Sequence, residues 1–343
     1  MLKYRFCTQL LPEKEDRKIV LLTGARQTGK TTLAKIRYPG LKYINLDAPE
    51  NRDYIKTVPS MFWGRDVGNA IIDEAQKEPS IFEKIKYAYD EKALNFTIIL
   101  GSSQILLIKK IRETLSGRIW IYELWPLMMK ELLLNEPIAE NIPQAPLIDK
   151  VFSSEKLCNI LGKLPSILSP EEEVLYRDVE DYLLKWGGMP ALLELNEEER
   201  WKWLKDYEYT YLERDLSDLA RLSDLSPFRK FQKLTALRSG GLLSYSEIAR
   251  DASISVDTAR RYLEYLNISY QVILLRPYYK NITSSVIKTP KVYWLDTGLL
   301  RQIIGFKDGV TGQIYETMVV SEILKWVRTS QRDCGVYFYR TRS

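Results

Sequence analysis

Residues 18–32 read Lys-Ile-Val-Leu-Leu-Thr-Gly-Ala-Arg-Gln-Thr-Gly-Lys-Thr-Thr, and this stretch decides the fold of the N-terminal part of the chain. The apolar run before Gly24 predicts a short buried strand, and the residues after Gly29 predict a helix. The two glycines allow tight turns that direct successive backbone N–H groups at one anion, and the helix N-terminus adds its partial positive charge. This order of elements predicts a phosphate-binding loop for a nucleoside triphosphate.

The residues of this loop have expected roles toward the nucleotide. Lys30 would reach the β- and γ-phosphates, and the Thr31 hydroxyl would bind Mg²⁺. The side chain of Arg26 is expected to point to solvent. The predicted nucleotide-binding residues are Gly24, Ala25, Arg26, Gln27, Thr28, Gly29, Lys30, Thr31 and Thr32.

A second motif, Ala-Ile-Ile-Asp-Glu at residues 70–74, reads as a buried strand that ends in two carboxylates. Asp73 suits the oxygen shell of Mg²⁺, because a hard cation prefers oxygen ligands. Glu74 can orient and polarise an attacking water as a general base. Together with the loop, this motif predicts hydrolysis of the nucleotide. The alternative is a pocket that binds nucleotide only as a switch.

Two more polar motifs are candidates for contact with the γ-phosphate. Ser102 and Ser103 follow a predicted strand directly, where a hydroxyl could bond the phosphate or the attacking water; the alternative is a helix N-cap. Arg118 could stabilise charge in the transition state, from its own chain or across a subunit boundary. The alternative for Arg118 is a surface arginine that opens a strand.

The first part of the chain alternates between strand and helix patterns. The predicted strands are residues 18–23, 42–47, 69–74, 95–100 and 118–124, with helical stretches such as 80–90 between them. Alternation of this kind predicts an α/β fold with a parallel sheet covered on both faces. Ligands in such sheets bind at the carboxyl ends of the strands, where the loop and the Asp-Glu pair fall.

Composition narrows the classes of protein and of site. The chain of 343 residues contains no histidine, which excludes His-based triads and most zinc sites. Its three cysteines lie far apart and make no metal-ligand spacing, which favours a reducing, cytoplasmic location. No apolar run approaches the roughly 20 residues of a membrane span, so no membrane partner is expected.

The middle of the chain reads as a linker followed by helices. Five prolines fall within residues 135–170, which indicates irregular structure. Ser169-Pro170-Glu171-Glu172 then carries a helix-start signal, and a second helical pattern includes Tyr207, Tyr211 and Leu219. These apolar faces are interpreted as core, and no site is expected in them.

Residues 226–295 have the order helix, short turn, helix, β-hairpin, which is that of a winged helix-turn-helix. Ser244 and Ser255 are the expected caps of the two helices, and residues 271–276 and 291–295 are the expected strands. Residues 229–291 contain 11 Lys or Arg against 4 Asp or Glu, whereas the whole chain has a net charge of only +5.

This concentration of positive charge is typical of contact with a phosphate backbone. Duplex DNA is therefore one candidate partner, with Arg260, Arg261 and Lys280 as the first candidate contacts. The alternative is a docking surface for a protein client or for a second copy, because lysine and arginine are common on any solvated face.

The combined motifs resemble a family of archaeal and bacterial AAA-type ATPases, and the resemblance extends from about residue 18 to the C-terminus. It is based on residues 22–32, 70–76, 99–103, 115–118, 123–127, 187–190, 210–215 and 293–299. It implies ATP rather than GTP as the nucleotide, and a C-terminal region with a winged helix and a degenerate nuclease-like fold.

The resemblance also sets expectations for the C-terminus. A helix at 312–327 and a strand at 335–340 would open the nuclease-like fold, with Glu316 as one of its acidic positions. The chain ends at Ser343, before the strands that would supply the other residues, which favours a truncated product or a fragment without nuclease activity. The predicted domains are residues 1–135, 136–225, 226–300 and 301–343.

Overall fold

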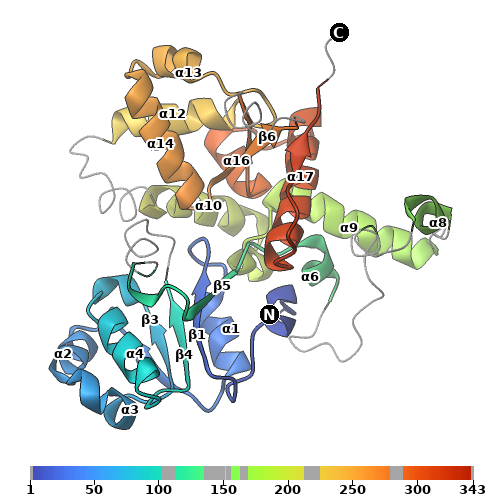
Figure 1. Ribbon diagram of the computed structural model, residues 1–343. Coiled ribbons are helices and arrows are strands. Elements are labelled where there is room, and N and C mark those ends of the chain that lie inside the picture. Colours follow the sequence, from blue (N-terminus) through green and yellow to red (C-terminus); the bar gives the residue numbers. More distant parts are fainter. Residues whose placement is uncertain are drawn as a thin grey trace.

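The computed structural model describes residues 3–101, 111, 113–134, 151, 156–162, 169–211, 225–278 and 289–340. The N-terminal part is a sheet with helices packed around it, and the C-terminal part is mainly helical with a second, smaller sheet (Figure 1). None of the helices in these ranges is long and apolar enough to cross a membrane.

The N-terminal sheet has five strands, and every pairing between them is parallel. The strands are β1 (Lys18–Thr23), β2 (Lys42–Asn45), β3 (Ala70–Asp73), β4 (Phe96–Leu100) and β5 (Ile119–Glu123). Their order across the sheet is β2-β3-β4-β1-β5. The predicted α/β core with a parallel sheet is confirmed, and each strand lies within the range expected from the sequence.

Alternate residues of the inner strand β1 face two different cores. Ile19 and Leu21 join one apolar cluster, whereas Val20 and Leu22 join another on the opposite face. The first cluster is covered by α2 (Pro49–Thr57), α3 (Trp63–Asp66) and α4 (Ile81–Asp90), and the second by α1 (Lys30–Arg37) and the segment around η1 (Phe6–Gln9). Both faces are therefore buried, which explains the continuous apolar runs of these strands.

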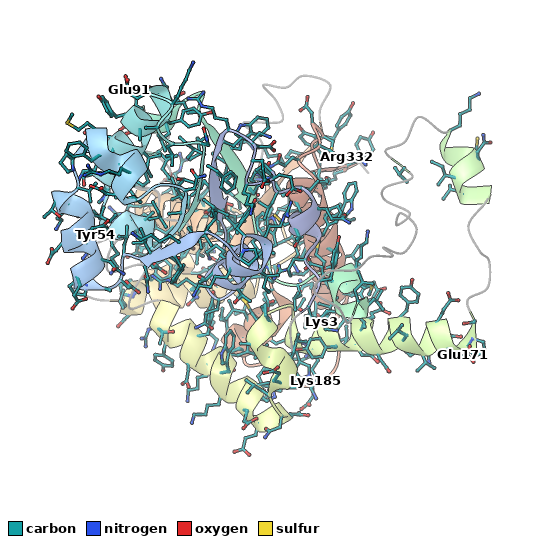
Figure 2. All side chains as sticks on the ribbon, turned by 90° about the horizontal axis from the view of Figure 1, so that it is seen from below. Lys3, Tyr54, Glu91, Glu171, Lys185 and Arg332 are labelled. Atoms are coloured by element: carbon teal, nitrogen blue, oxygen red, sulfur yellow. The ribbon has the colours of Figure 1, made fainter. Side chains whose placement is uncertain are left out.

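Helices α6 (Met129–Leu133), α8 (Leu157–Gly162), α9 (Pro170–Trp186) and α10 (Glu197–Tyr211) follow the sheet. Ser169 caps α9, and the Glu172 side chain bonds back to the Ser169 N–H, so the helix start read from the sequence is confirmed. The far end of α9, near Glu171, projects away from the rest of the molecule, while Lys185 lies close to its body (Figure 2). Helix α10 begins earlier than expected, and residues 212–224 lie outside the described part of the chain.

The C-terminal region contains the expected helices and hairpin. Its elements are α12 (Ser226–Ala236), α13 (Tyr245–Ala252), α14 (Val256–Ile268), β6 (Val272–Pro277), β7 (Lys291–Trp294), α16 (Thr297–Ile304) and α17 (Gly312–Thr329). Ser244 accepts from the Glu247 N–H, and Ser255 accepts from the Thr258 N–H, so both expected caps form. Strands β6 and β7 pair antiparallel.

The last strand is β8 (Tyr337–Phe338), within residues 335–340, where the sequence predicts a strand. It pairs in parallel with β6, where Tyr337 lies beside Arg276, and the nuclease-like fold stays a prediction. The outer edge of β6 offers backbone groups that the short segment after α17 can reach. Residues 335–340 therefore extend the hairpin sheet.

Three segments that are far apart in sequence meet at a backbone junction, which we define by Leu127, Gly187, Gly188, Asp296 and Gly298. The Leu127 N–H donates to the Gly188 carbonyl at 2.6 Å, and the Gly188 N–H donates to the Asp296 carboxylate at 2.8 Å. A β-carbon on Gly298 would lie 2.0 Å from the Trp186 carbonyl oxygen. Only glycine permits these backbones to approach so closely.

Substitution of Gly298 by alanine is expected to lower the free energy of unfolding by about 1–3 kcal/mol or more, because the added methyl group meets backbone atoms that cannot rotate away. Gly40→Ala is the matched control, since nothing lies within 4 Å of its β-carbon position. Urea denaturation of both variants measures the difference. Equal urea denaturation midpoints for the two variants would show that the backbone at the junction moves to accommodate the added methyl group at little cost.

Candidate functional site

The phosphate loop, residues 24–29, connects the end of β1 to the start of α1. Gly24 has a φ of 146°, and a β-carbon on it would lie 2.1 Å from the Leu124 carbonyl oxygen. Gly29 has a φ of 93° and is the N-cap of α1. Both glycines therefore occupy backbone conformations that a side chain would strain, and they shape the turn that leads into the helix N-terminus.

The Lys30 side chain folds back over this loop. Its ammonium group donates to the carbonyl oxygens of Gly24 at 3.1 Å and Ala25 at 2.7 Å. The Thr28 hydroxyl donates to the Ala25 carbonyl at 3.0 Å and fixes the middle of the loop. A positive charge thus lies beside the helix N-terminus, which is a suitable position for binding a phosphate group.

Thr31 and Asp73 are brought together from two separate elements. The Thr31 hydroxyl donates to Asp73 Oδ2 at 2.6 Å, and the Tyr43 hydroxyl donates to the same oxygen at 2.9 Å. Asp73 is buried at the end of β3, and burial followed by the bond to Asp73 raises the pKa of Tyr43, which keeps it a donor. A hydroxyl and a carboxylate side by side form an oxygen donor set that fits Mg²⁺.

Glu74, the next residue, adopts the left-handed conformation with a φ of 53°. Burial, then repulsion from Asp73, raises the pKa of its carboxyl group, while the charge of Arg26 opposes that shift. The Gln76 amide donates to the Glu74 carboxylate and orients it. A carboxylate held in this way can accept a proton from a water molecule.

The side chain of Arg26 departs from the expectation that it points to solvent. It is half-buried, lines the cavity above the loop and lies near enough to Glu74 to influence its pKa. Helix α10 covers this side of the loop, and the Tyr207 hydroxyl donates to the Arg26 carbonyl at 3.4 Å. Because α10 covers the loop, Arg26 lies beside protein on this side, whereas the sequence predicted that it would face open solvent.

The cavity above the loop has a volume of about 460 Å³. Gly29, Lys30, Thr31, Asp73 and Glu74 form its floor. Its opposite wall is formed by Pro190, Tyr207 and Thr210. This volume is within the usual range for small-molecule sites. The sequence did not indicate this wall, because Tyr207 had the helical spacing of a core residue and Thr210 was marked only as the first residue of the 210–215 segment of the family resemblance.

The N-terminal segment supports the loop from below. Arg5 is buried, and its guanidinium donates to the Thr28 carbonyl at 2.7 Å and also to the Trp125 carbonyl. Glu131 lies 3.3 Å from the same guanidinium. Nothing in the sequence around Arg5 signalled this role, because its partners are backbone carbonyls of remote segments.

Beside Arg5 a second recess of about 240 Å³ opens next to the cavity. It shares Gly29, Thr32 and Pro190 with the cavity above the loop. Its apolar lining residues are Leu33, Ile36, Leu127, Ala191 and Leu193.

Arg118 does not lie near the phosphate loop of its own chain. It precedes β5, whose residue Ile119 pairs with Ile19, whereas the loop follows Thr23, roughly 13 Å further along β1. Its guanidinium instead makes two bonds to the Asp90 carboxylate, at 2.6 and 3.0 Å. Of the alternatives for Arg118, the structure therefore fits a surface arginine that opens a strand rather than a contact in cis, because the strand direction carries it to the amino edge of the sheet; a role across a subunit boundary stays a prediction.

The structure describes only some of the other residues that the sequence predicted as contacts with the nucleotide or with DNA. Ser102, Ser103 and Lys280 lie outside the described residues. Arg260 and Arg261 are both exposed on α14, and the Arg260 guanidinium lies over the Tyr245 ring at 5.3 Å from its centroid.

Glu316 has protein partners. Its carboxylate accepts from Lys291 at 2.8 Å and from Tyr293 at 2.6 Å. Within the described ranges, no group of three or more Cys, Asp or Glu residues could hold a metal ion.

Comparison with known proteins gives two family matches. Residues 16–133 match a family model described as an AAA domain, and residues 176–309 match one described as a domain of unknown function, DUF8612. Uncharacterised proteins of Mycobacterium tuberculosis and Methanocaldococcus jannaschii are 27% and 26% identical, over 94% and 85% of this chain. The chain spans 65% of the length of each of these relatives.

Among solved structures, the Walker-type ATPase PABY2304 of Pyrococcus abyssi is similar at 16% identity, with a TM-score of 0.49 and coverage of 87% of this chain and 99% of that one. A signal transduction ATPase with numerous domains from Pyrococcus horikoshii is similar at 12% identity, with a TM-score of 0.28 and coverage of 93% and 44%. The AAA domain match, together with the parallel sheet and its phosphate loop, supports a P-loop ATPase family for the N-terminal part of the chain.

Proposed function

We propose that this protein binds ATP with Mg²⁺ at the phosphate loop and hydrolyses it. The observation that carries the proposal is the 2.6 Å contact between Thr31 and Asp73 below a cavity that Lys30 and Glu74 also line. Residues of a phosphate loop and of a strand end meet here, as metal-assisted phosphoryl transfer requires.

Each residue of the site has a distinct role in this proposal. The backbone of residues 24–29 and the Lys30 ammonium would bind the phosphates, and Thr31 and Asp73 would hold Mg²⁺, which would neutralise charge on the phosphate oxygens. Glu74 accepts a proton from the attacking water, and Tyr43 keeps the Asp73 carboxylate oriented. Tyr207 and Thr210 form the wall that limits the access of bulk water.

We assign the base of the nucleotide to the recess beside Arg5. The recess is continuous with the phosphate cavity through Gly29, Thr32 and Pro190, and its apolar lining suits a flat aromatic ring. Thr8 and Glu194 add polar groups at its border. A nucleotide lying across both spaces would touch the sheet domain and the segment after Gly188 at once.

The region of α12–α14 and β6–β7 is, in this proposal, a winged helix-turn-helix whose position follows the state of the nucleotide. Tyr270, in the turn between α14 and β6, supports such a link. Its hydroxyl donates to Glu123 at 3.1 Å, and its ring packs edge-on against Trp125 with the centroids 4.8 Å apart. Glu123 pairs in register with Thr23, the residue just before the phosphate loop.

The electrostatics of this contact make it sensitive to small movements. Burial raises the pKa of Glu123, and the nearby charge of Arg328 and the bond from Tyr270 oppose the shift. Glu123 is half-buried, and a carboxyl group in such a position that depends on two partners from other elements loses stability when either moves. A movement of the loop transmitted through Thr23 would therefore reach the turn that carries Tyr270.

Lys30→Ala is expected to weaken ATP binding by roughly ten- to hundred-fold, because it removes a charged donor to the phosphates. Titration with a fluorescent ATP analogue measures the dissociation constant. Lys202→Ala, which removes an exposed lysine of α10, is the control and should bind like wild type. Equal affinity of the Lys30 variant and wild type would place the nucleotide elsewhere.

Glu74→Gln is expected to keep ATP affinity within about threefold but to reduce kcat by about a hundred-fold, because the amide cannot accept the proton from water. Phosphate release at saturating ATP and Mg²⁺ measures kcat, and Glu83→Gln on the exposed side of α4 is the control. Very slow turnover by wild type itself would instead favour a nucleotide switch that docks a protein partner.

Tyr270→Phe is expected to change the ATP dissociation constant or kcat by about fivefold, since it removes the hydroxyl that links α14 to Glu123. The control is Tyr176→Phe at an exposed position of α9. Thermal melting of each variant separates this effect from a loss of folding. Unchanged kinetics in a folded Tyr270 variant would contradict the proposed link.

A further inference from the structure

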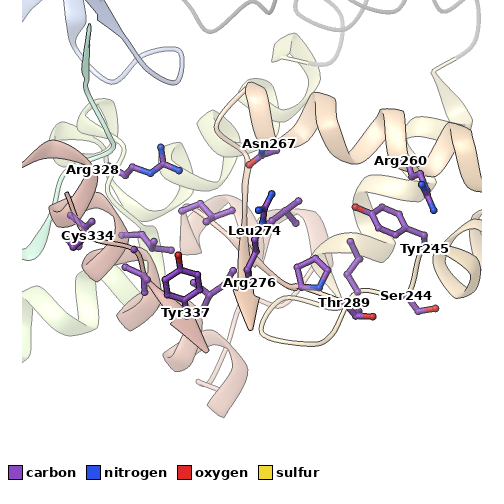
Figure 3. Close-up of a pocket in the computed structure, with 18 of the residues that line it drawn as sticks. Ser244, Tyr245, Arg260, Asn267, Leu274, Arg276, Thr289, Arg328, Cys334 and Tyr337 are labelled. Carbon is purple, nitrogen blue, oxygen red and sulfur yellow. The ribbon is translucent and has the colours of Figure 1, made fainter. Parts of the chain in front are cut away.

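A groove of about 1190 Å³ lies on the C-terminal region (Figure 3), and none of the residues that line it lines the nucleotide cavity. It is bordered by α14 and the start of α13 on one side, by β6 along its floor and by the end of α17 with the segment after it on the other side. Four arginines line it, namely Arg260, Arg276, Arg328 and Arg332. Of the described residues that line it, only Asp333 carries a negative charge.

The arginines are spread along the groove. Figure 3 shows Arg328 near one end, Arg276 in the middle and Arg260 near the other end. Arg276 and Arg328 are exposed, although Arg328 also offsets the buried charge of Glu123. A row of separated cations suits a chain of phosphates better than a single small anion.

Aromatic rings accompany these charges. Tyr245 borders the groove beneath the Arg260 guanidinium, and Tyr337 borders it with half of its surface exposed. Tyr337 also makes an edge contact with the exposed Tyr278, with the ring centroids 6.2 Å apart. Tyr245 is half-buried beneath Arg260, so the exposed ring of Tyr337 is the one that provides a stacking surface for an unpaired base.

The shape of the site argues against a duplex as its occupant. A recognition helix reads duplex DNA by projecting into the major groove, so its contacts lie on a convex surface. Here the charges line a hollow between α14 and α17, and Arg261, the neighbour of Arg260 on α14, is not among the residues that line it. A single strand is narrow enough to follow such a hollow.

We propose that this groove binds single-stranded nucleic acid, with its arginines on the phosphates and Tyr337 against a base. The inference goes beyond ATP hydrolysis and does not depend on it. It also replaces the expected duplex contact by Arg261 with a site centred on Arg276.

Fluorescence anisotropy of a labelled single-stranded 15-mer with the whole chain, in the absence of nucleotide, tests the proposal. If the strand contacts four arginines, its affinity should fall about 50-fold between 50 and 200 mM salt, from a slope of about −0.7 per phosphate. The same sequence as a duplex should bind more weakly. Tighter binding of the duplex, or no saturable binding of the single strand, overturns the proposal.

Arginine variants test whether the single strand binds in the groove. Arg276→Ala and Arg332→Ala should each weaken binding about fivefold and make the salt dependence shallower, whereas Arg276→Lys should retain most of the affinity. Arg261→Ala is the matched control, since it removes the same charge from a position that does not line the groove. If Arg261→Ala lost as much affinity for the single strand, the contact would lie on the outer face of α14, and the proposed binding in the groove would be wrong.

Two further measurements separate binding in the groove from the ATPase proposal and from binding of an acidic protein segment. Lys30→Ala should bind the single strand like wild type, so a failed ATPase proposal leaves this test intact. Polyglutamate of the same charge should compete poorly, and equal competition would assign the groove to an acidic protein segment and contradict the proposal. Thermal melting shows that each variant is folded.

Discussion

The arrangement of this molecule depends on close contact between backbones at the junction of Leu127, Gly188 and Asp296. The buried Asp296 carboxylate accepts from the N–H groups of Gly188 and Leu299, so one side chain caps α16 and also fixes the segment after α9. That segment leads into Pro190 and then α10, which together cover the phosphate loop. A nucleotide site between the sheet and α10 therefore requires the junction, although no junction residue touches the cavity above the loop.

The sequence predicted the N-terminal fold because local signals and the global fold agree there. The three inner strands β1, β3 and β4 are buried on both faces, which produces short apolar runs bounded by polar residues. The pairing of β8 with β6 was not predictable in this way. A two-residue strand has no periodicity, and its partner is decided by where α17 delivers the chain.

The residues of the candidate site also fall into two groups: some are marked by local sequence motifs, and others reach the site from remote segments. Thr31 and Asp73 were predicted because both sit beside motifs whose strands end at one edge of the sheet. Tyr207 and Arg5 were missed because they reach the loop from remote segments through backbone carbonyls, which leaves no pattern in the sequence. For Arg118 the motif left several roles open, and the structure fits a surface arginine at the start of a strand, because strand direction carries a residue before β5 to the edge opposite the loop.

The half-buried carboxyl group of Glu123 lies between the proposed nucleotide site and the arginine groove and contacts residues next to each. Arg328 lines the groove and its charge stabilises Glu123, while Glu123 accepts from Tyr270 and pairs with Thr23 beside the phosphate loop. A polyanion that draws Arg328 toward its phosphates would weaken the support of Glu123. Since linkage between two binding sites is reciprocal, nucleotide binding would then alter the affinity of the groove by the same factor. The two sites are thus positioned for coupling through a single charge.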